Sequence, residues 1–173
     1  MIVTLDTVQG THALGEALGS RLTAGDLVIL SGSLGAGKTT LTKGIAAGLG
    51  VAGRITSPTF VIARVHRPAA ATGVPLVHVD AYRLAGALEL DDLDLDTDLT
   101  AAAVVVEWGD GVADRLSDDR LIVELTRLPD DSRTARLTAV GDGWRERLPA
   151  VLAALDGAPG RRLSCRSSPA ADS

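Results

Sequence analysis

The sequence predicts a three-layer α/β fold with a mainly parallel sheet and added antiparallel edge strands. Short apolar runs alternate along the chain with segments whose apolar residues recur at helical spacing, as in βαβ units. The apolar run 27–30 leads into the glycine-rich segment 31–40, which is typical of a buried strand followed by a tight turn. Two β-rich runs flank the polar segment 129–134, and this pattern indicates an antiparallel hairpin at the edge of the sheet.

The N-terminal half is predicted to alternate strands with helices. Apolar residues between Ala13 and Leu22 recur at helical spacing, and Thr7 or Thr11 can cap the helix that carries them. β-Branched residues are frequent from Thr59 to Val65, as expected of a strand. The expected elements are, in order, a strand at 2–5, a helix that ends near 24–25, a strand at 27–30, a helix at 38–49, and strands at 59–65 and 76–79.

The C-terminal half is predicted to complete the sheet and to end in an unpacked tail. The chain from Gly157 onward is too polar and too rich in proline and glycine to pack. We therefore expect one domain at residues 1–156 and a disordered tail at residues 157–173. The remaining expected elements are a short helix at 84–93, a strand at 101–106, hairpin strands at 121–126 and 135–140, and a closing helix at 143–155.

The composition narrows the possible functions. A chain of 173 residues, of which 46% are hydrophobic, can form one core without disulfides or metal. Its net charge of −5 and its 2% of aromatic residues disfavour direct binding to nucleic acid, which uses basic faces and stacking platforms. The only cysteine, Cys165, cannot form a disulfide within the chain. No apolar run reaches membrane-spanning length and the start does not resemble a leader, so we expect a cytoplasmic protein without membrane contact.

The glycine-rich segment carries the strongest functional pattern. Gly32, Gly37, Lys38 and Thr39 fit G-x-x-x-x-G-K-[ST] between a strand and a helix, which predicts a P-loop NTPase fold. Such a loop turns its amides toward phosphate, its lysine reaches the β- and γ-phosphates, and its hydroxyl binds Mg²⁺. The alternative is a plain glycine-rich turn, although Lys38 is one of only two lysines in the chain. The residues expected to bind nucleotide here are Gly32, Gly35, Ala36, Gly37, Lys38, Thr39 and Thr40.

Two acidic residues end apolar runs and are candidates for the metal site. Asp80 follows the run 76–79, where P-loop proteins place an acidic partner of Mg²⁺; the alternative is an aspartate that caps a turn. Glu107 follows the run 101–106 and can polarise water or bind the metal; the alternative is a solvent-exposed acid. We therefore expect Thr39, Asp80 and Glu107 at the metal, with Glu107 and Lys38 as the catalytic residues.

Other polar and aromatic positions have weaker interpretations. The segment 57–60, Ser-Pro-Thr-Phe, is either a switch that senses the γ-phosphate or a plain turn. His78 is expected to be a hydrogen-bonded core histidine, while Trp108 and Trp144 are expected to be packing residues. The acidic segment 89–98 does not fit a calcium loop, and indicates a solvated face or a docking surface for a basic partner.

The chain contains no asparagine, which excludes the N-K-x-D signature of GTPases and favours ATP. Over approximately residues 10–150, an ordered set of four motifs resembles the bacterial TsaE family. These motifs are GSLGAGKTT at 32–40, SPTF at 57–60, the H-x-D-x-Y-R-L pattern at 78–84 and VEW at 106–108.

The resemblance implies an ATPase that supports threonylcarbamoyladenosine modification of tRNA together with the TsaB and TsaD proteins, contacting tRNA only through that complex. It places Lys38 and Thr39 on phosphate and Mg²⁺, and Asp80 and Glu107 at the metal. Two further positions, Thr11 and Arg133, match family residues near the nucleotide. Ser33 stands where family members usually have aspartate, which bears on the rate of hydrolysis and not on phosphate binding.

Two other functions remain open from the sequence. Many small-molecule kinases combine a strand, a P-loop and a helix at this size, but they usually carry an arginine-rich lid, whereas the arginines here are scattered. The chain can also be a non-catalytic nucleotide-binding assembly module, as Ser33 and the acidic segment suggest. ATP turnover measured with and without partner proteins separates this module from an ATPase, and rapid phosphate transfer to a small metabolite would instead indicate a kinase.

Overall fold

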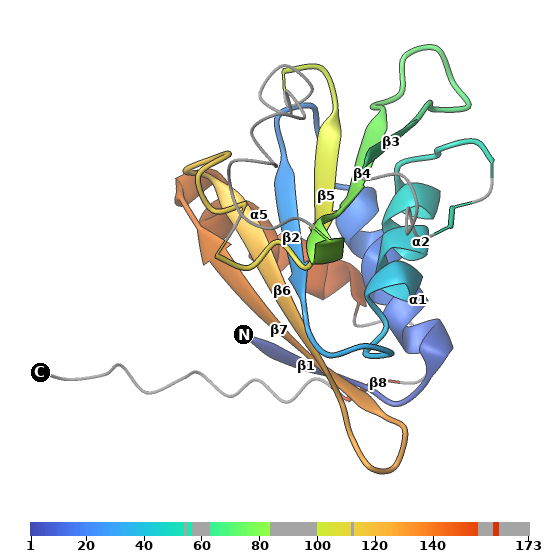
Figure 1. Cartoon of the computed structure of the whole chain (residues 1–173), viewed down its shortest axis with the longest axis vertical. Coiled ribbons are helices and arrows are strands. Elements are labelled where there is room, and N and C mark those ends of the chain that lie inside the picture. The colour runs from blue at the N-terminus through green and yellow to red at the C-terminus, as the bar shows by residue number, and fades with distance from the viewer. Residues whose placement is uncertain (54, 57–62, 84–99, 112, 156–160, 163–173) are drawn as a thin grey trace, which may run out of the picture.

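A computed structural model describes residues 1–53, 55–56, 63–83, 100–111, 113–155 and 161–162 of the chain (Figure 1). Its strands are β1 (Ile2–Leu5), β2 (Leu27–Ser31), β3 (Ala63–His66), β4 (Leu76–Asp80), β5 (Ala103–Glu107), β6 (Arg120–Arg127), β7 (Arg133–Val140) and β8 (Arg161–Arg162). Its helices are α1 (Val8–Gly19), α2 (Lys38–Gly48), α5 (Asp142–Leu155) and a 3-10 turn at Ala81–Arg83.

The strands form one mixed sheet in the order β3-β4-β5-β2-β6-β7-β1-β8. Parallel pairing joins β4 to β5, β5 to β2 and β2 to β6, and the other neighbours are antiparallel. The prediction of a mainly parallel sheet is therefore only partly right. The hairpin β6–β7 is also not at the edge as predicted, because β6 pairs with the free side of β2 and β1 pairs with the outer side of β7.

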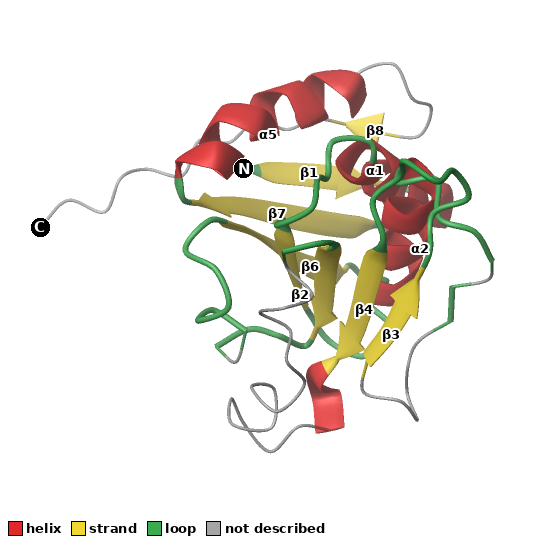
Figure 2. Ribbon diagram, turned by 90° about the horizontal axis from the view of Figure 1, so that it is seen from above, coloured by secondary structure: helices red, strands yellow, loops and turns green. Residues whose placement is uncertain are grey.

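Helices α1, α2 and α5 share one hydrophobic core with one face of the sheet. In Figures 1 and 2, α1 and α2 lie side by side, and α5 runs alongside β1 and β7. The opposite face of the central strands forms a second core with Ala81, Ala102 and Ala113, so β2, β4 and β5 are buried on both faces. The helix predicted at 84–93 lies outside the described residues, and a third layer stays a prediction.

Helices α1 and α2 pack backbone to backbone through four glycines, which we call the glycine interface. Glycines 15 and 19 lie on α1 and glycines 44 and 48 lie on α2, with a spacing of four residues in each helix. This spacing puts each pair on one helical face and lets the backbones approach closely. A Cβ atom would lie 2.3 Å from Leu41 O at Gly15, 2.1 Å from Ile45 O at Gly19, 2.0 Å from His12 O at Gly44 and 2.3 Å from Glu16 O at Gly48.

The C-terminal end of helix α1 differs from the prediction. Helix α1 is capped by Thr7, whose Oγ1 accepts a bond of 3.0 Å from Gly10 N, but it ends at Gly19 and not near residue 24. The Ser20 hydroxyl donates to the carbonyl of Ala17 at 2.9 Å and so competes with the backbone amide that would continue the helix. Two turn hydrogen bonds follow, from Arg21 N to Leu18 O and from Leu22 N to Gly19 O.

The segment after residue 156, predicted not to pack, contributes the two-residue strand β8, which pairs with Thr4 and Leu5 and so satisfies backbone groups of β1. Within the described part of the chain, no helix is long and apolar enough to span a membrane.

Candidate nucleotide-binding site

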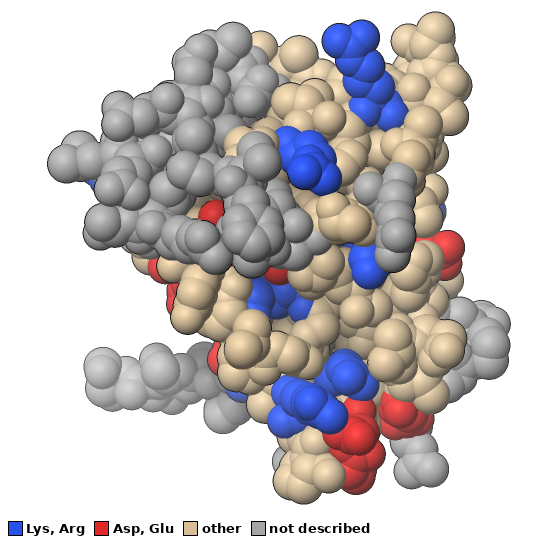
Figure 3. Space-filling model, turned by 45° about the vertical axis from the view of Figure 1, so that its right-hand side comes forward, with Lys and Arg blue, Asp and Glu red and all other residues tan. Residues whose placement is uncertain are grey.

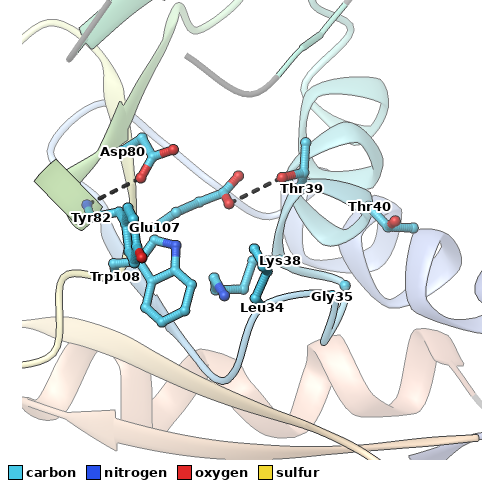
Figure 4. Close-up of a pocket in the computed structure, with 10 residues that line it drawn as sticks. Leu34, Gly35, Lys38, Thr39, Thr40, Asp80, Tyr82, Glu107 and Trp108 are labelled. Carbon is cyan, nitrogen blue, oxygen red and sulfur yellow. Dashed lines mark hydrogen bonds between the residues drawn. The ribbon is translucent and has the colours of Figure 1, made fainter. Parts of the chain in front are cut away.

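A pocket of about 350 Å³ opens where the carboxyl ends of β2, β4 and β5 meet the N-terminus of α2 (Figure 4). Ligands of α/β proteins bind at this edge of a sheet, because loops from neighbouring parallel strands converge there. The pocket is lined by Leu34, Gly35, Gly37, Lys38, Thr39, Thr40, Asp80, Tyr82, Glu107 and Trp108. Seven of these ten belong to the sequence-predicted site, so the fold brings the P-loop and both acidic residues to one pocket.

The loop between β2 and α2 has a backbone shape that only glycine tolerates. Gly32 has φ 130°, and a Cβ there would lie 2.2 Å from the backbone oxygen of Leu125. Gly37 has φ 113° and precedes α2 without a side-chain cap for the helix. The N-terminus of α2 therefore presents its amides and its positive dipole end at the pocket, as an anion site requires.

Lys38 supplies the ammonium group of the pocket. Its Nζ donates to Gly32 O at 2.7 Å and to Ser33 O at 3.1 Å, and it lies 3.4 Å from the centre of the Trp108 ring. Burial lowers the pKa of Lys38 below its ordinary value of 10.5, while the charges of Glu107 and Asp80 act in the opposite direction. The lysine is thus held inside the loop and is not a surface lysine.

Glu107 forms a buried hydrogen-bonded cluster at the end of β5. Its side chain is 3% exposed, so the alternative of a solvent-exposed acid does not hold. Oε2 accepts a bond of 3.1 Å from Thr39 Oγ1, and Oε1 lies 2.8 Å from His78 Nε2 and 3.2 Å from Thr42 Oγ1. The Glu107 carboxylate is therefore hydrogen-bonded to the Thr39 hydroxyl, the group that the P-loop pattern predicts to bind a metal.

Asp80 lies beside Glu107 because β4 and β5 are parallel and pair these two residues in register. Its Oδ1 accepts a bond of 3.1 Å from Tyr82 N, so it caps the turn that follows β4 and also lines the pocket. In Figure 4 the Glu107 carboxylate points toward Thr39, while one carboxylate oxygen of Asp80 is turned toward Tyr82 N. The two interpretations of Asp80 from sequence are therefore compatible.

The donor set at this end of the pocket fits magnesium. Thr39 offers a hydroxyl oxygen, and Asp80 and Glu107 offer carboxylate oxygens. Mg²⁺ is usually bound by one or two carboxylates, with the remaining positions taken by substrate phosphates and water. Lys38 lines the same pocket and is close enough to feel the charges of both carboxylates.

Three residues assigned with the P-loop occupy other positions around it. A Cβ on Gly37 would lie 3.6 Å from Thr11 Cγ2 and from Arg133 Nε, so both residues sit beside the loop. Thr11 is buried on α1, and Arg133 Nη1 donates to Asp131 O at 2.6 Å. Ala36 is fully buried and its amide bonds to Ser33 O, a structural role within the turn. The switch candidate at 57–60 and the acidic segment at 89–98 lie outside the described residues.

Several pocket residues were missed from the sequence. Trp108 was assigned to packing, but its left-handed backbone, with φ 62°, accompanies a ring that lies over Lys38. The Tyr82 ring lies tilted at 52° against the Trp108 ring with ring centres 5.0 Å apart, and Leu34 at the loop apex is 90% exposed. The VEW motif drew attention to Trp108, but nothing in the sequence shows the backbone conformation that accompanies this placement.

Charges of both signs alternate on the hairpin β6–β7 beside the P-loop. Arg127 pairs with Asp131 at 2.6 Å and Arg136 pairs with Glu124 at 3.4 Å. Figure 3 shows basic and acidic side chains lying next to each other on this face. The described part of this face therefore has no broad basic surface for nucleic acid.

Comparison with known proteins identifies the family to which the chain is similar. The family model described as threonylcarbamoyl adenosine biosynthesis protein TsaE matches residues 5–135. A Streptomyces coelicolor protein named tRNA threonylcarbamoyladenosine biosynthesis protein TsaE is 54% identical over 145 residues, covering 81% of this chain and 97% of the relative. A Mycobacterium bovis protein of the same name is 57% identical over 139 residues, covering 76% of this chain and 83% of the relative.

A solved structure and a further relative are also similar to this chain. The crystal structure of Bacillus subtilis YdiB is similar to this chain with a TM-score of 0.72 and 29% sequence identity, covering 88% of this chain and 94% of the YdiB chain. A Bacillus subtilis protein named TsaE is 38% identical over 135 residues, 78% of this chain. The matched family and these relatives show that the chain belongs to the TsaE family of tRNA threonylcarbamoyladenosine biosynthesis proteins.

Proposed function

We propose that this chain binds ATP with Mg²⁺ and hydrolyses it slowly, in support of the threonylcarbamoyladenosine modification of tRNA. The observation that carries the proposal is the convergence of Lys38, Thr39 and Glu107 on one pocket at the N-terminus of α2. An ammonium group on one side and two carboxylates on the other complement the phosphate and metal parts of a magnesium nucleotide.

The phosphate part of the site consists of the loop and the start of α2. The amides around Gly35 and Gly37 and the end of the helix dipole bind the β-phosphate. Lys38 donates at present to two loop carbonyls, and turning its flexible side chain outward brings the same ammonium group to the β- and γ-phosphates. Thr40 lies one residue further along the helix and supports the α-phosphate.

The metal part of the site consists of Thr39, Asp80 and Glu107. When bound, Mg²⁺ supplies positive charge that neutralises the β- and γ-phosphate oxygens. Thr39 Oγ1 and Glu107 Oε2 are 3.1 Å apart, close enough for both oxygens to face one ion or one of its water ligands. Glu107 also orients the attacking water, and Lys38 stabilises the charge on the transferred phosphoryl group.

The proposed partners are the TsaB and TsaD proteins, on which the chain docks while it binds and hydrolyses ATP. The support is membership of the TsaE family together with the absence of a broad basic surface on the described hairpin face, which favours indirect contact with tRNA. If docking depends on whether ATP or its product is bound, partner binding controls hydrolysis. A low intrinsic rate of ATP hydrolysis in the free chain is then expected.

The test is a calorimetric titration of the chain with Mg-ATP, followed by turnover measured with and without TsaB and TsaD. Lys38→Ala removes a charge-assisted phosphate contact and should weaken ATP binding about ten-fold or more. Lys43→Ala is the matched control, because Lys43 is the only other lysine and is exposed on the same helix. A chain that binds no Mg-ATP, or equal weakening by both variants, would refute the proposal.

A further inference from the structure

We propose that His78 is a positioning residue that fixes the Glu107 carboxylate so that only Oε2 faces Thr39 and the metal side of the pocket. The inference deepens the proposed function and rests on it. His78 is fully buried on β4, Glu107 is 3% exposed on the neighbouring strand β5, and their Nε2 and Oε1 atoms are 2.8 Å apart. His78 itself does not line the pocket, so it acts only through Glu107.

The hydrogen-bonding capacities of the two groups determine which atom donates. An ionised carboxylate only accepts, so His78 must carry its proton on Nε2. In the neutral tautomer its Nδ1 is then a bare acceptor, and Nδ1 indeed has no hydrogen-bond partner in the described part of the protein. The tautomer is thus set by the contact with Glu107 alone.

The hydroxyl of Thr42, the second group near Glu107 Oε1, does not donate to it at all times. Thr42 Oγ1 lies 3.2 Å from Glu107 Oε1, but it also lies 3.1 Å from the carbonyl of Lys38. A hydroxyl has one proton and cannot serve both acceptors at once. His78 has no competing acceptor for Nε2 among the described hydrogen bonds, so it provides the permanent bond to Oε1.

This arrangement divides the carboxylate into two functional halves. Oε1 is held in the interior by His78, and Oε2 is left to Thr39 and the pocket. Without the donor, Glu107 would lose the bond that restrains rotation about its side-chain torsions. Groups that orient the ligands of a metal typically change metal affinity or activity by about 10- to 100-fold when they are removed.

The experiment compares His78→Gln with His78→Asn. The glutamine amide nitrogen extends as far as imidazole Nε2 and can donate to Glu107, whereas the asparagine amide is one methylene shorter and cannot reach it. We expect His78→Asn to lower single-turnover ATP hydrolysis about 10- to 100-fold, and His78→Gln to stay within about three-fold of wild type. Nucleotide affinity without magnesium should be unchanged in both variants, because the phosphate loop does not contact His78.

A readout without nucleotide tests the same contact. The chain has three histidines, so a long-range ¹H–¹⁵N NMR spectrum can resolve each imidazole. We expect His78 in the Nε2–H tautomer, with an Nε2 proton shift that moves to the unbonded range in Glu107→Ala. A signal that is unchanged in Glu107→Ala would show that His78 Nε2 does not donate to Glu107.

The outcomes separate the two proposals. If wild type neither binds nor hydrolyses Mg-ATP, the proposed function fails, and the NMR result still decides the contact. If wild type hydrolyses ATP and the two His78 variants fall equally or not at all, the positioning role is wrong while the function stands. Combining His78→Asn with Glu107→Gln gives a further check, since independent effects would multiply and a shared effect would not.

Discussion

The glycine interface between α1 and α2 gives a prediction about stability that can be worked out from distances. In Gly44→Ala the new methyl group would lie 2.0 Å from the backbone oxygen of His12, whereas ordinary contacts begin at 3.4 Å. The helices must therefore separate by 3.4 − 2.0 = 1.4 Å, because the obstacle is backbone and cannot turn away. That shift also loosens the packing of Leu41 and Ile45, which are fully buried on α2.

The expected magnitude combines a gain and a loss. Alanine stabilises a helix interior by about 1 kcal/mol over glycine, and overpacking of a tight core costs about 1–3 kcal/mol or more. A backbone clash belongs at the upper end, so we expect a net loss of about 2–3 kcal/mol in the free energy of unfolding. Because α2 begins with Lys38 and Thr39, the same shift should weaken Mg-ATP binding.

The assay is urea denaturation of wild type, Gly44→Ala and Gly50→Ala, followed by circular dichroism. Gly50 is the matched control: it has φ 67° but a Cβ would meet nothing within 4 Å, so its substitution should cost about 1 kcal/mol. Equal stabilities for the two variants, or a Gly44→Ala protein as stable as wild type, would show that α1 and α2 do not pack this closely.

Three other perturbations test the site and the core. Glu107→Gln should slow ATP hydrolysis about 100-fold or more in single-turnover assays at saturating Mg-ATP, and an unchanged rate would assign Glu107 to structure alone. Burial, together with the charges of His78 and Arg64, lowers the pKa of His66 below its ordinary value of 6.5. The folded protein therefore favours the neutral imidazole, and stability is lost as the pH falls from 6.5 toward the folded pKa. Melting temperatures measured from pH 8 to 5 should decline less in His66→Gln than in wild type. Arg147 Nη1 donates to the buried carboxylate of Asp26 at 2.8 Å, so Arg147→Ala should lower the free energy of unfolding by about 2 kcal/mol in urea, with the conservative Arg147→Lys losing less.

The sequence indicated the central strands and the phosphate loop because their signals are local. The apolar runs of β2, β4 and β5 are buried on both faces. The glycine-rich loop follows β2, and β4 and β5 end in the acidic residues Asp80 and Glu107, which line the pocket. In-register parallel pairing then places Asp80 beside Glu107, as the rule for carboxyl ends of strands predicts.

The remaining features depend on pairings that local patterns do not encode. Strand β7 pairs with β6 locally, but its second partner, β1, lies more than 125 residues away in the chain, so the hairpin could not be placed inside the sheet. His78 was correctly expected to be a hydrogen-bonded core histidine, yet its partner Glu107 is 29 residues distant. The four-residue spacing of glycines in α1 and α2 was visible, and it went unused because each glycine alone only suggests a weak helix.

The ammonium group and the two carboxylates on opposite sides of the pocket have a thermodynamic consequence. A bare nucleotide entering the proposed site meets the repulsion of Asp80 and Glu107, and a bare divalent cation meets that of Lys38. Each ligand removes the penalty of the other, so their affinities are linked and the coupling is reciprocal. The free magnesium concentration in the surrounding solution would thus determine the fraction of the protein that has ATP bound.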